Sequence, residues 1–141
     1  MKKKFLVLTT ALVMAFSATF ANDNSSVPAS IVTELHQKFA DANDVQWQTT
    51  ANYYEATFTI NGHQLKAFYS FDGELIGMSR QISVDQLPMA LNADVKDKSA
   101  TNKITDLFEL LTDRGTEYYI KYQGEKGTKT YKSTGDYWTR Y

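Results

Sequence analysis

The stretch 52-NYYEATFTINGHQLKAFYSFDGELIGM-78 decides the predicted fold. It contains the dipeptides Asn61-Gly62 and Asp72-Gly73, whose glycines lie eleven residues apart. Asn-Gly and Asp-Gly favour two-residue type I′ turns, because the twist of these turns matches the twist of paired strands. The spacing therefore predicts three antiparallel strands joined by two tight hairpins.

Two-residue turns also fix the register, and the register assigns every side chain to one face of the sheet. Across the first turn Phe58 is expected to pair with Leu65. Across the second turn Phe71 is expected to pair with Glu74. The face that carries these pairs is mainly apolar and is predicted to be the core face. The opposite, outer face is mostly polar, with Tyr53, Ser70 and Leu75 predicted in one cross-strand row, and it carries the candidate binding residues Tyr53, Glu55, Lys66, Phe68 and Leu75.

The first 21 residues have the pattern of a secretory signal peptide. Three lysines, 2–4, precede an apolar run over 5–16, and Thr19-Phe20-Ala21 places small residues at a cleavage site. A membrane anchor is the alternative, but the run is shorter than the roughly 20 residues that a spanning helix needs. No second apolar run is long enough to span a bilayer. We expect cleavage near Ala21 and a periplasmic or secreted protein of residues 22–141.

Composition excludes several classes of function. The chain has no cysteine, which rules out disulfides, zinc–thiolate sites, thiol catalysis and a lipid-anchored cysteine. Three of the 15 basic residues lie in the predicted leader, so residues 22–141 carry 12 basic and 16 acidic residues, a net charge of −4. Nucleic-acid binding needs a concentrated basic surface, and this chain lacks one.

The second half of the chain resembles the first half in its pattern. Leu87-Pro88 follows Val27-Pro28 by sixty residues, and Gly124 and Gly135 are again eleven residues apart. In the first half, an apolar stripe at helical spacing follows the proline and comprises Ile31, Leu35 and Phe39. These features predict one α+β domain made of two repeats, 27–82 and 85–141. Each repeat is a helix followed by antiparallel β-strands, with the helices packed on one face of a curved sheet.

One segment of the second half is ambiguous. Residues 103–111 fit a helix through Ile104, Leu107, Phe108 and Leu111, or a strand through Ile104, Phe108 and Leu110. With Glu125-Lys126 taken as the next turn, Tyr119, Lys132 and Tyr137 are predicted to form one row. The outer face of this half then carries the candidate residues Tyr119, Lys121, Lys132, Tyr137 and Tyr141.

The pattern resembles a known family. Val45 to Trp47, Tyr53 to Leu75, the Leu-Pro that follows and the second Tyr-Tyr unit are similar to PepSY-like periplasmic proteins with the fold of the β-lactamase inhibitor protein, BLIP. The resemblance implies tandem helix-plus-sheet repeats, a Gram-negative periplasm, a strand at 103–111 and no catalytic residues. BLIP-type members bind another protein across the concave sheet face, and PepSY domains are regarded as regulators of peptidases.

No set of residues converges on a chemical reaction. His36 and His63 lack a second ligand at useful spacing. The acidic pairs Asp41/Asp44 and Asp94/Asp97 lack the alternating oxygens of a calcium loop, and they are read as helix caps and solvated loops. No nucleophile-elbow motif and no glycine-rich phosphate loop is present. The sequence therefore predicts a protein that is not an enzyme and needs no metal or cofactor.

The aromatic outer face is the remaining signal. Tyrosine-rich surfaces supply a large contact area at low entropic cost. We expect this face to bind a protein or peptide of the cell envelope whose identity the sequence does not give, with an inhibitory or regulatory effect. The alternative is a periplasmic carrier that holds a small ligand in a cleft between the two half-sheets. The oligomeric state is left open.

Overall fold

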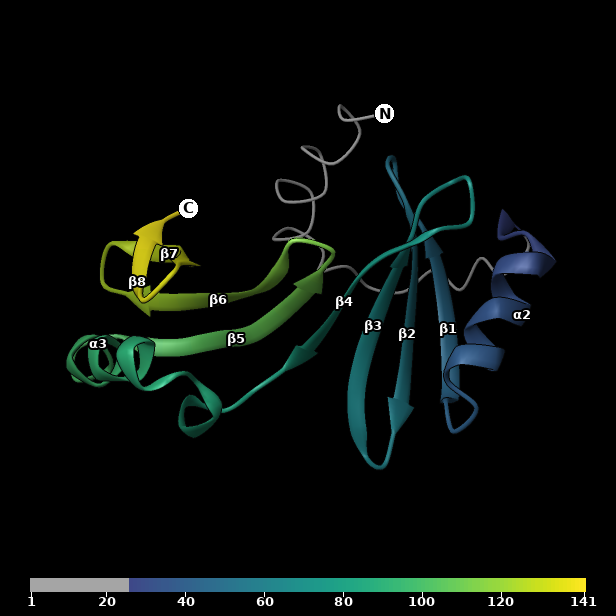
Figure 1. The fold of residues 1–141 in the computed structure, drawn as a ribbon. Helices are drawn as coiled ribbons and strands as arrows, with labels where there is room; N and C mark the ends of the chain where they lie inside the picture. The colour runs from purple at the N-terminus through teal and green to yellow at the C-terminus, as the bar shows by residue number, and fades with distance from the viewer. Residues whose placement is uncertain (1–25) are drawn as a thin grey trace. The chain divides into compact units, whose positions relative to one another are not determined.

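The structure, a computed structural model, describes residues 26–141 (Figure 1). The predicted signal peptide and its cleavage site lie outside the described residues. The chain divides into two compact units: unit 1 ends at Ile76 and unit 2 begins at Gly77. Each unit is described by itself. The predicted domain limits, 22–141 with repeats at 27–82 and 85–141, stay a prediction.

The secondary structure is mainly β. Unit 1 contains α2 (Ala29–Lys38), β1 (Asn43–Thr49), β2 (Tyr54–Ile60), β3 (His63–Tyr69) and the start of β4 (Leu75–Gln81). Unit 2 continues with the 3₁₀ turn η3 (Val84–Gln86), α3 (Met89–Ser99), β5 (Lys103–Thr112), β6 (Gly115–Gly124), β7 (Gly127–Thr134) and β8 (Tyr137–Arg140).

The predicted fold class is wrong. The eight strands form an antiparallel sheet in the order of the sequence, and the described residues include only two α-helices, of 10 and 11 residues. Residues 26–141 therefore form a β-sheet with two short α-helices, and not an α+β tandem repeat of helix and strands. The difference arises because the strands are long: β5 and β6 take ten residues each, which leaves few residues for helices.

The first hairpin confirms the predicted register. Tyr54 pairs with Tyr69, and Ile60 pairs with His63, at the two ends of the β2–β3 ladder. Asn61 and Gly62 occupy the turn with φ of 50° and 78°. Asparagine and glycine tolerate this left-handed conformation best, which explains why the dipeptide located the turn correctly.

The second hairpin differs from the prediction. Ser70 donates its N–H to the Glu74 carbonyl oxygen at 2.8 Å, and Gly73 donates to the Ser70 carbonyl oxygen at 3.0 Å. The loop therefore has three residues, 71–73, and the predicted Phe71–Glu74 pair is wrong. Gly73, at φ 91°, takes the left-handed position that such a loop requires. The predicted row of Tyr53, Ser70 and Leu75 depended on a two-residue loop and loses that support.

The core of unit 1 lies between α2 and one face of the β1–β3 sheet (Figure 1). Ile31 and Leu35 are buried on α2, in agreement with the predicted apolar stripe. Just after the helix, Phe39 packs on Phe58 with ring centroids 5.2 Å apart. Burial of these side chains supplies the main stabilising free energy of the unit.

The core of unit 2 lies between α3 and one face of β5–β8. Leu107 and Ile120 are buried here together with Val95 of α3. Residues 103–112 form a strand, so the strand reading of 103–111 is confirmed. A bulge between Ile104 and Asp106 explains the ambiguous pattern, because one extra residue places Ile104 and Leu107 on the same face.

The last two turns of unit 2 determine which residues share its outer face. Gly124 pairs with Gly127, which confirms the Glu125-Lys126 turn. Thr134 pairs with Tyr137 across Gly135-Asp136, whereas the predicted row required Tyr137 to pair with Lys132. Lys132 consequently pairs with Thr139, and the predicted row through Tyr137 is wrong. The shift leaves the parity unchanged, so Tyr137 stays on the outer face.

Candidate functional site

The candidate site is a group of side chains on the outer face of unit 2, opposite α3. We call it the tyrosine cluster and define it as Glu117 and Tyr119 of β6, Lys132 of β7, Tyr137 of β8 and Tyr141, the residue that follows β8. Strand pairing places Lys132 beside Tyr119, and the N–H of Tyr141 donates to β7 at the Thr130 carbonyl oxygen. The ladder therefore positions the cluster through backbone hydrogen bonds.

Tyr119 forms the base of the cluster. Its side chain is fully buried, and its ring stacks on Phe108 of the neighbouring strand with centroids 5.1 Å apart and planes within 5°. Tyr141 packs edge-on against the other side of Tyr119, with centroids 5.8 Å apart. Stacked and edge-to-face aromatic pairs each stabilise such a site beyond simple area burial. Tyr141 is therefore attached to a rigid base.

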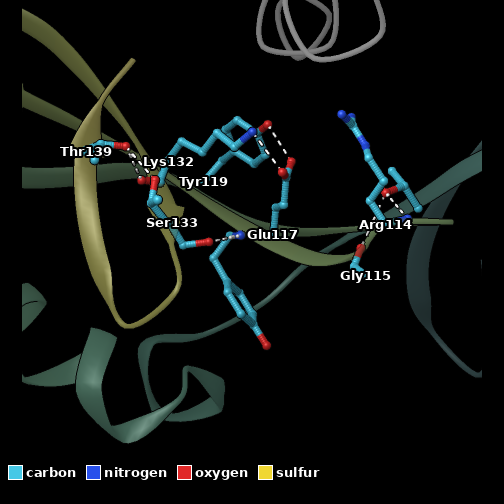
Figure 2. A network of polar contacts seen from close by, with 10 residues as sticks. Arg114, Gly115, Glu117, Tyr119, Lys132, Ser133 and Thr139 are labelled. Carbon is cyan, nitrogen blue, oxygen red and sulfur yellow. Dashed lines mark hydrogen bonds and ion pairs between the residues drawn. The ribbon is translucent and has the colours of Figure 1, made fainter. Parts of the chain in front are cut away.

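A polar network surrounds the base (Figure 2). The Tyr119 hydroxyl donates to Glu117 Oε2 at 3.1 Å, and Lys132 Nζ lies 2.8 Å from Glu117 Oε1. Lys132 Nζ also lies 5.7 Å from the centroid of the Tyr119 ring, within the range of a cation–π contact. The Thr139 hydroxyl donates to the Lys132 carbonyl oxygen at 3.1 Å. These contacts hold the lysine and the glutamate in defined orientations on the face.

The phenols of Tyr119 and Tyr141 stay neutral across the physiological pH range. Burial raises the pKa of Tyr119, and the nearby Glu117 carboxylate raises it further. Burial, followed by Glu117, also raises the pKa of Tyr141. Neutral phenols combine an apolar ring with a hydroxyl that can donate a hydrogen bond. The site is therefore suited to contact and hydrogen bonding, and not to nucleophilic attack by a phenolate.

Two members of the cluster face solvent. Tyr137 is 58% exposed and Tyr141 is 43% exposed. Lys132 and Lys121, another predicted site residue on the same face, are half-buried. Exposed aromatic side chains beside lysines are available to a partner without rearrangement of the unit. This is the part of the predicted binding face that the structure leaves accessible.

The predicted site residues of unit 1 lie in the interior. Tyr53, Glu55, Lys66 and Phe68 are buried, and Leu75 is half-buried. Tyr53 packs edge-on against Phe68 with centroids 5.4 Å apart, and burial raises the pKa of Tyr53 to about 12. In this structure the four buried side chains contribute packing, because almost none of their surface reaches solvent.

An ion pair lies beside these aromatic residues. Lys66 Nζ is 2.6 Å from Glu55 Oε1, and the two side chains are only 10% and 2% exposed. The second carboxylate oxygen, Oε2 of Glu55, is buried and has no hydrogen-bond partner in the described part of the chain. Glu55 therefore depends strongly on Lys66, since an unpaired charge in the interior is costly.

Two residues of the tyrosine cluster region escaped the sequence prediction. Phe108, the stacking partner of Tyr119, was assigned to no face because the bulge hid the strand alternation. Glu117 lies two residues before Tyr119, so strict alternation along β6 places both side chains on the same face. The period-two pattern could therefore have identified Glu117.

The remaining polar candidates are dispersed. His36 and His63 are exposed, as are the two acidic pairs Asp41/Asp44 and Asp94/Asp97. Among residues 26–141, no group of three or more His, Cys, Asp or Glu is arranged to hold a metal ion. No helix in that range is both long enough and apolar enough to cross a membrane.

A shallow polar cleft lies elsewhere in unit 2. It has a volume of about 430 Å³ and is lined by Thr101, Asn102 and the hairpin residues 124–127 and 129. None of the ten predicted site residues lines this cleft.

Comparison with known proteins identifies the fold. No family model and no curated protein matches the chain. A BLIP-like protein from Bacteroides fragilis matches with a TM-score of 0.64 and 15% identity, over 84% of this chain and 90% of that one. A DUF2874 family protein from Bacteroides ovatus matches with a TM-score of 0.67 and 19% identity, over 76% and 79%.

A third solved structure, titled "putative periplasmic proteins" from Bacteroides eggerthii, matches with a TM-score of 0.71 and 16% identity. The match covers 81% of this chain and 88% of that one. At these identities the likeness concerns the fold. The chain has a BLIP-like fold.

Proposed function

We propose that this chain is an exported, non-enzymatic binding module of the PepSY-like type, which docks a protein or peptide of the cell envelope on the outer face of unit 2. The observation that carries the proposal is the pair of exposed tyrosines, Tyr137 and Tyr141, beside Lys132 on one sheet face. The effect on the partner would be inhibitory or regulatory.

The setting of the proposal comes from the chain's N-terminus and from its structural neighbours. The first 21 residues have the pattern of a signal peptide, and one neighbour is described as periplasmic. A second neighbour is named BLIP-like. Fold analogy alone is a weak basis for function, so the argument depends on the site.

The geometry of the tyrosine cluster suits a docking surface. Tyr141 leans on Tyr119, which itself stacks on Phe108, so the exposed ring loses little freedom when a partner binds. Preorganised tyrosines beside charged groups are typical of binding hot spots. Lys132 and the half-buried Glu117 add a defined polar pair next to the rings. A protein or peptide that offers an apolar group flanked by polar ones would fit this surface.

The proposal can be tested with a double variant, Tyr137→Ala/Tyr141→Ala. Leu111→Ala is the matched control, because Leu111 is 51% exposed and lies on the opposite face of the same unit. Capture of proteins from cell-envelope extract should lose a specific band with the double variant and keep it with the control. The melting temperatures should stay within a few degrees of the parent. An unchanged band with the double variant would disprove docking at this face.

The alternative of a small-ligand carrier stays open as a prediction. It requires a discrete ligand whose binding raises the melting temperature of the chain in proportion to its concentration. A thermal-shift screen with planar and apolar molecules distinguishes the two functions, because a docking surface shows no such shift.

A further inference from the structure

The free edge of β1 is a second surface with its own binding potential, independent of the tyrosine cluster. β1 stands first in the strand order, and no strand among residues 26–141 pairs with its outer edge. Exposed edges carry unpaired N–H and C=O groups that can accept an additional strand. The question is which groups of β1 point outward and what kind of strand they would accept.

The hydrogen bonds of β1 identify the outward groups. Thr50 donates its N–H to the Tyr53 carbonyl oxygen at 2.9 Å, so these two residues form a hydrogen-bonded pair. Bonded and non-bonded pairs alternate along an antiparallel ladder. In the register that pairs Gln48 with Glu55, the N–H and C=O groups of residues 46 and 48 therefore point toward β2. The backbone groups that point away from β2 in the regular part of β1 are those of Trp47 and Thr49.

Apart from an irregularity at its start, the edge of β1 lacks the usual protection against an added strand. Natural edge strands carry lysine or proline, are very short, or are twisted by bulges. β1 has seven residues, NDVQWQT, without lysine or proline, and its one irregularity lies between Asn43 and Gln46. β8, at the other end of the strand order, has only four residues and ends in Arg140. The open edge is therefore specific to β1.

Charge indicates the chemistry of the added strand. Residues 26–76 contain two lysines and six acidic residues, a net charge of −4. Asp41 and Asp44 are both exposed at the start of β1, and Gln46 and Gln48 supply neutral polar side chains along it. Electrostatic complementarity favours a basic partner and disfavours an acidic one.

We propose that the edge of β1 binds an extended, lysine-rich segment of a partner chain by strand addition. The segment forms backbone hydrogen bonds with Trp47 and Thr49, while its lysines lie near Asp41 and Asp44. This site is separate from Tyr137 and Tyr141. Failure of strand addition would leave docking on the outer face of unit 2 untouched.

The direct test is amide hydrogen exchange followed by NMR, with a capped seven-residue peptide of alternating lysine and valine as the probe. In the free protein, the amides of Trp47 and Thr49 should exchange quickly, while that of Gln48 is protected. Saturating peptide should slow the two outward amides about tenfold or more. A peptide with glutamate in place of lysine should bind at least about tenfold more weakly.

Variants of β1 and of its neighbouring acidic residues distinguish the contribution of backbone hydrogen bonds to peptide binding from that of charge. Thr49→Pro removes an outward N–H and leaves the β1–β2 ladder intact, so it should weaken peptide binding about tenfold with little change in melting temperature. Thr49→Val is its matched control, because both variants lose the contact between the Thr49 and Ser26 hydroxyls at 2.6 Å. Asp41→Asn/Asp44→Asn should weaken binding about threefold or more at low salt and less at high salt.

Three results would overturn the proposal. Slow exchange at Trp47 and Thr49 in the free protein would mean that the edge is already covered. Equal affinities of the lysine and glutamate peptides would exclude a preference for a basic partner. Concentration-dependent dimerisation that Thr49→Pro abolishes and Thr49→Val retains would assign the edge to a second copy of the chain.

Discussion

The buried Glu55–Lys66 pair allows the sharpest test of the interior of unit 1. In Lys66→Met, the lysine stem is largely replaced by a side chain of similar length, but the positive charge is lost. Glu55 then remains 2% exposed with both oxygens unpaired, because Oε2 already has no partner in the described residues. Removing one member of a buried pair costs about 3–5 kcal/mol.

The double variant Glu55→Leu/Lys66→Met should recover most of that loss. Replacing a buried pair by apolar side chains of similar volume is often neutral or stabilising. We therefore expect the double variant to lie within about 1 kcal/mol of the parent, so that adding Glu55→Leu to Lys66→Met should restore roughly 3 kcal/mol of stability. Urea unfolding followed by tryptophan fluorescence measures each free energy of unfolding.

The reasoning would be refuted by a small effect of the single variant. If Lys66→Met costs less than about 1 kcal/mol, the pair behaves as a solvated surface ion pair. The face of Tyr53 and Phe68 would then be open, as the sequence alone suggested. A double variant that is no more stable than Lys66→Met would show instead that the packing, and not the charge, is disturbed.

Three further predictions follow from the described contacts. Five of the nine tyrosines have raised pKa values, with burial as the main cause: Tyr53, Tyr69, Tyr119, Tyr122 and Tyr141. Stability should be constant below pH 10 and fall as pH rises from 10 to 12, because these phenols then ionise in the unfolded chain and not yet in the folded one. Absorbance at high pH should show their late titration. Gly124→Ala should cost about 1 kcal/mol, because its Cβ would lie 2.5 Å from Asn102 Oδ1 and the Asn102 side chain would have to turn away from the Lys98 carbonyl oxygen and the Thr101 hydroxyl. The added cost should vanish in a background of Asn102→Ala, as a urea-unfolding cycle would show. Trp138→Phe should cost about 1–2 kcal/mol, because it removes the 3.1 Å hydrogen bond from Trp138 Nε1 on β8 to the Leu91 carbonyl oxygen on α3. A fall in melting temperature of less than about 2 °C would contradict this prediction.

Local turn chemistry was the most predictable part of the fold. The Asn61-Gly62 turn and its register follow from the need for positive φ at both central residues. Asp72-Gly73 misled the prediction because a glycine at positive φ suits both a two-residue turn and the observed three-residue loop. The choice between them depends on how the flanking strands pair, and the dipeptide does not carry that information.

The fold class could not be read from the periodicity alone. Ile31 and Leu35 correctly indicated a helix, but α3 has no comparable apolar stripe in its sequence. The β-bulge at the start of β5 hid the alternation of its apolar residues. The clear apolar stripe of α2 made helices look more important than they are, and the bulge made the strands look less continuous than they are.

Burial of the candidate site was also beyond the sequence. Strand alternation assigns Tyr53 and Phe68 to a face, but it does not say whether anything covers that face. Both side chains are buried, whereas Tyr137 and Tyr141 are exposed. The sequence therefore identified the residue types and their faces, and only the packed structure separates accessible side chains from interior ones.

The central claim is that the exposed tyrosines of unit 2 contact a partner in the cell envelope. Site-specific photocrosslinking in intact cells tests it most directly, with a photoreactive phenylalanine placed at Tyr137 and, as the control, at Leu111 on the opposite face. We predict a discrete crosslinked adduct from position 137 and none from position 111. Adducts of equal yield from both positions, or none from position 137, would contradict the claim.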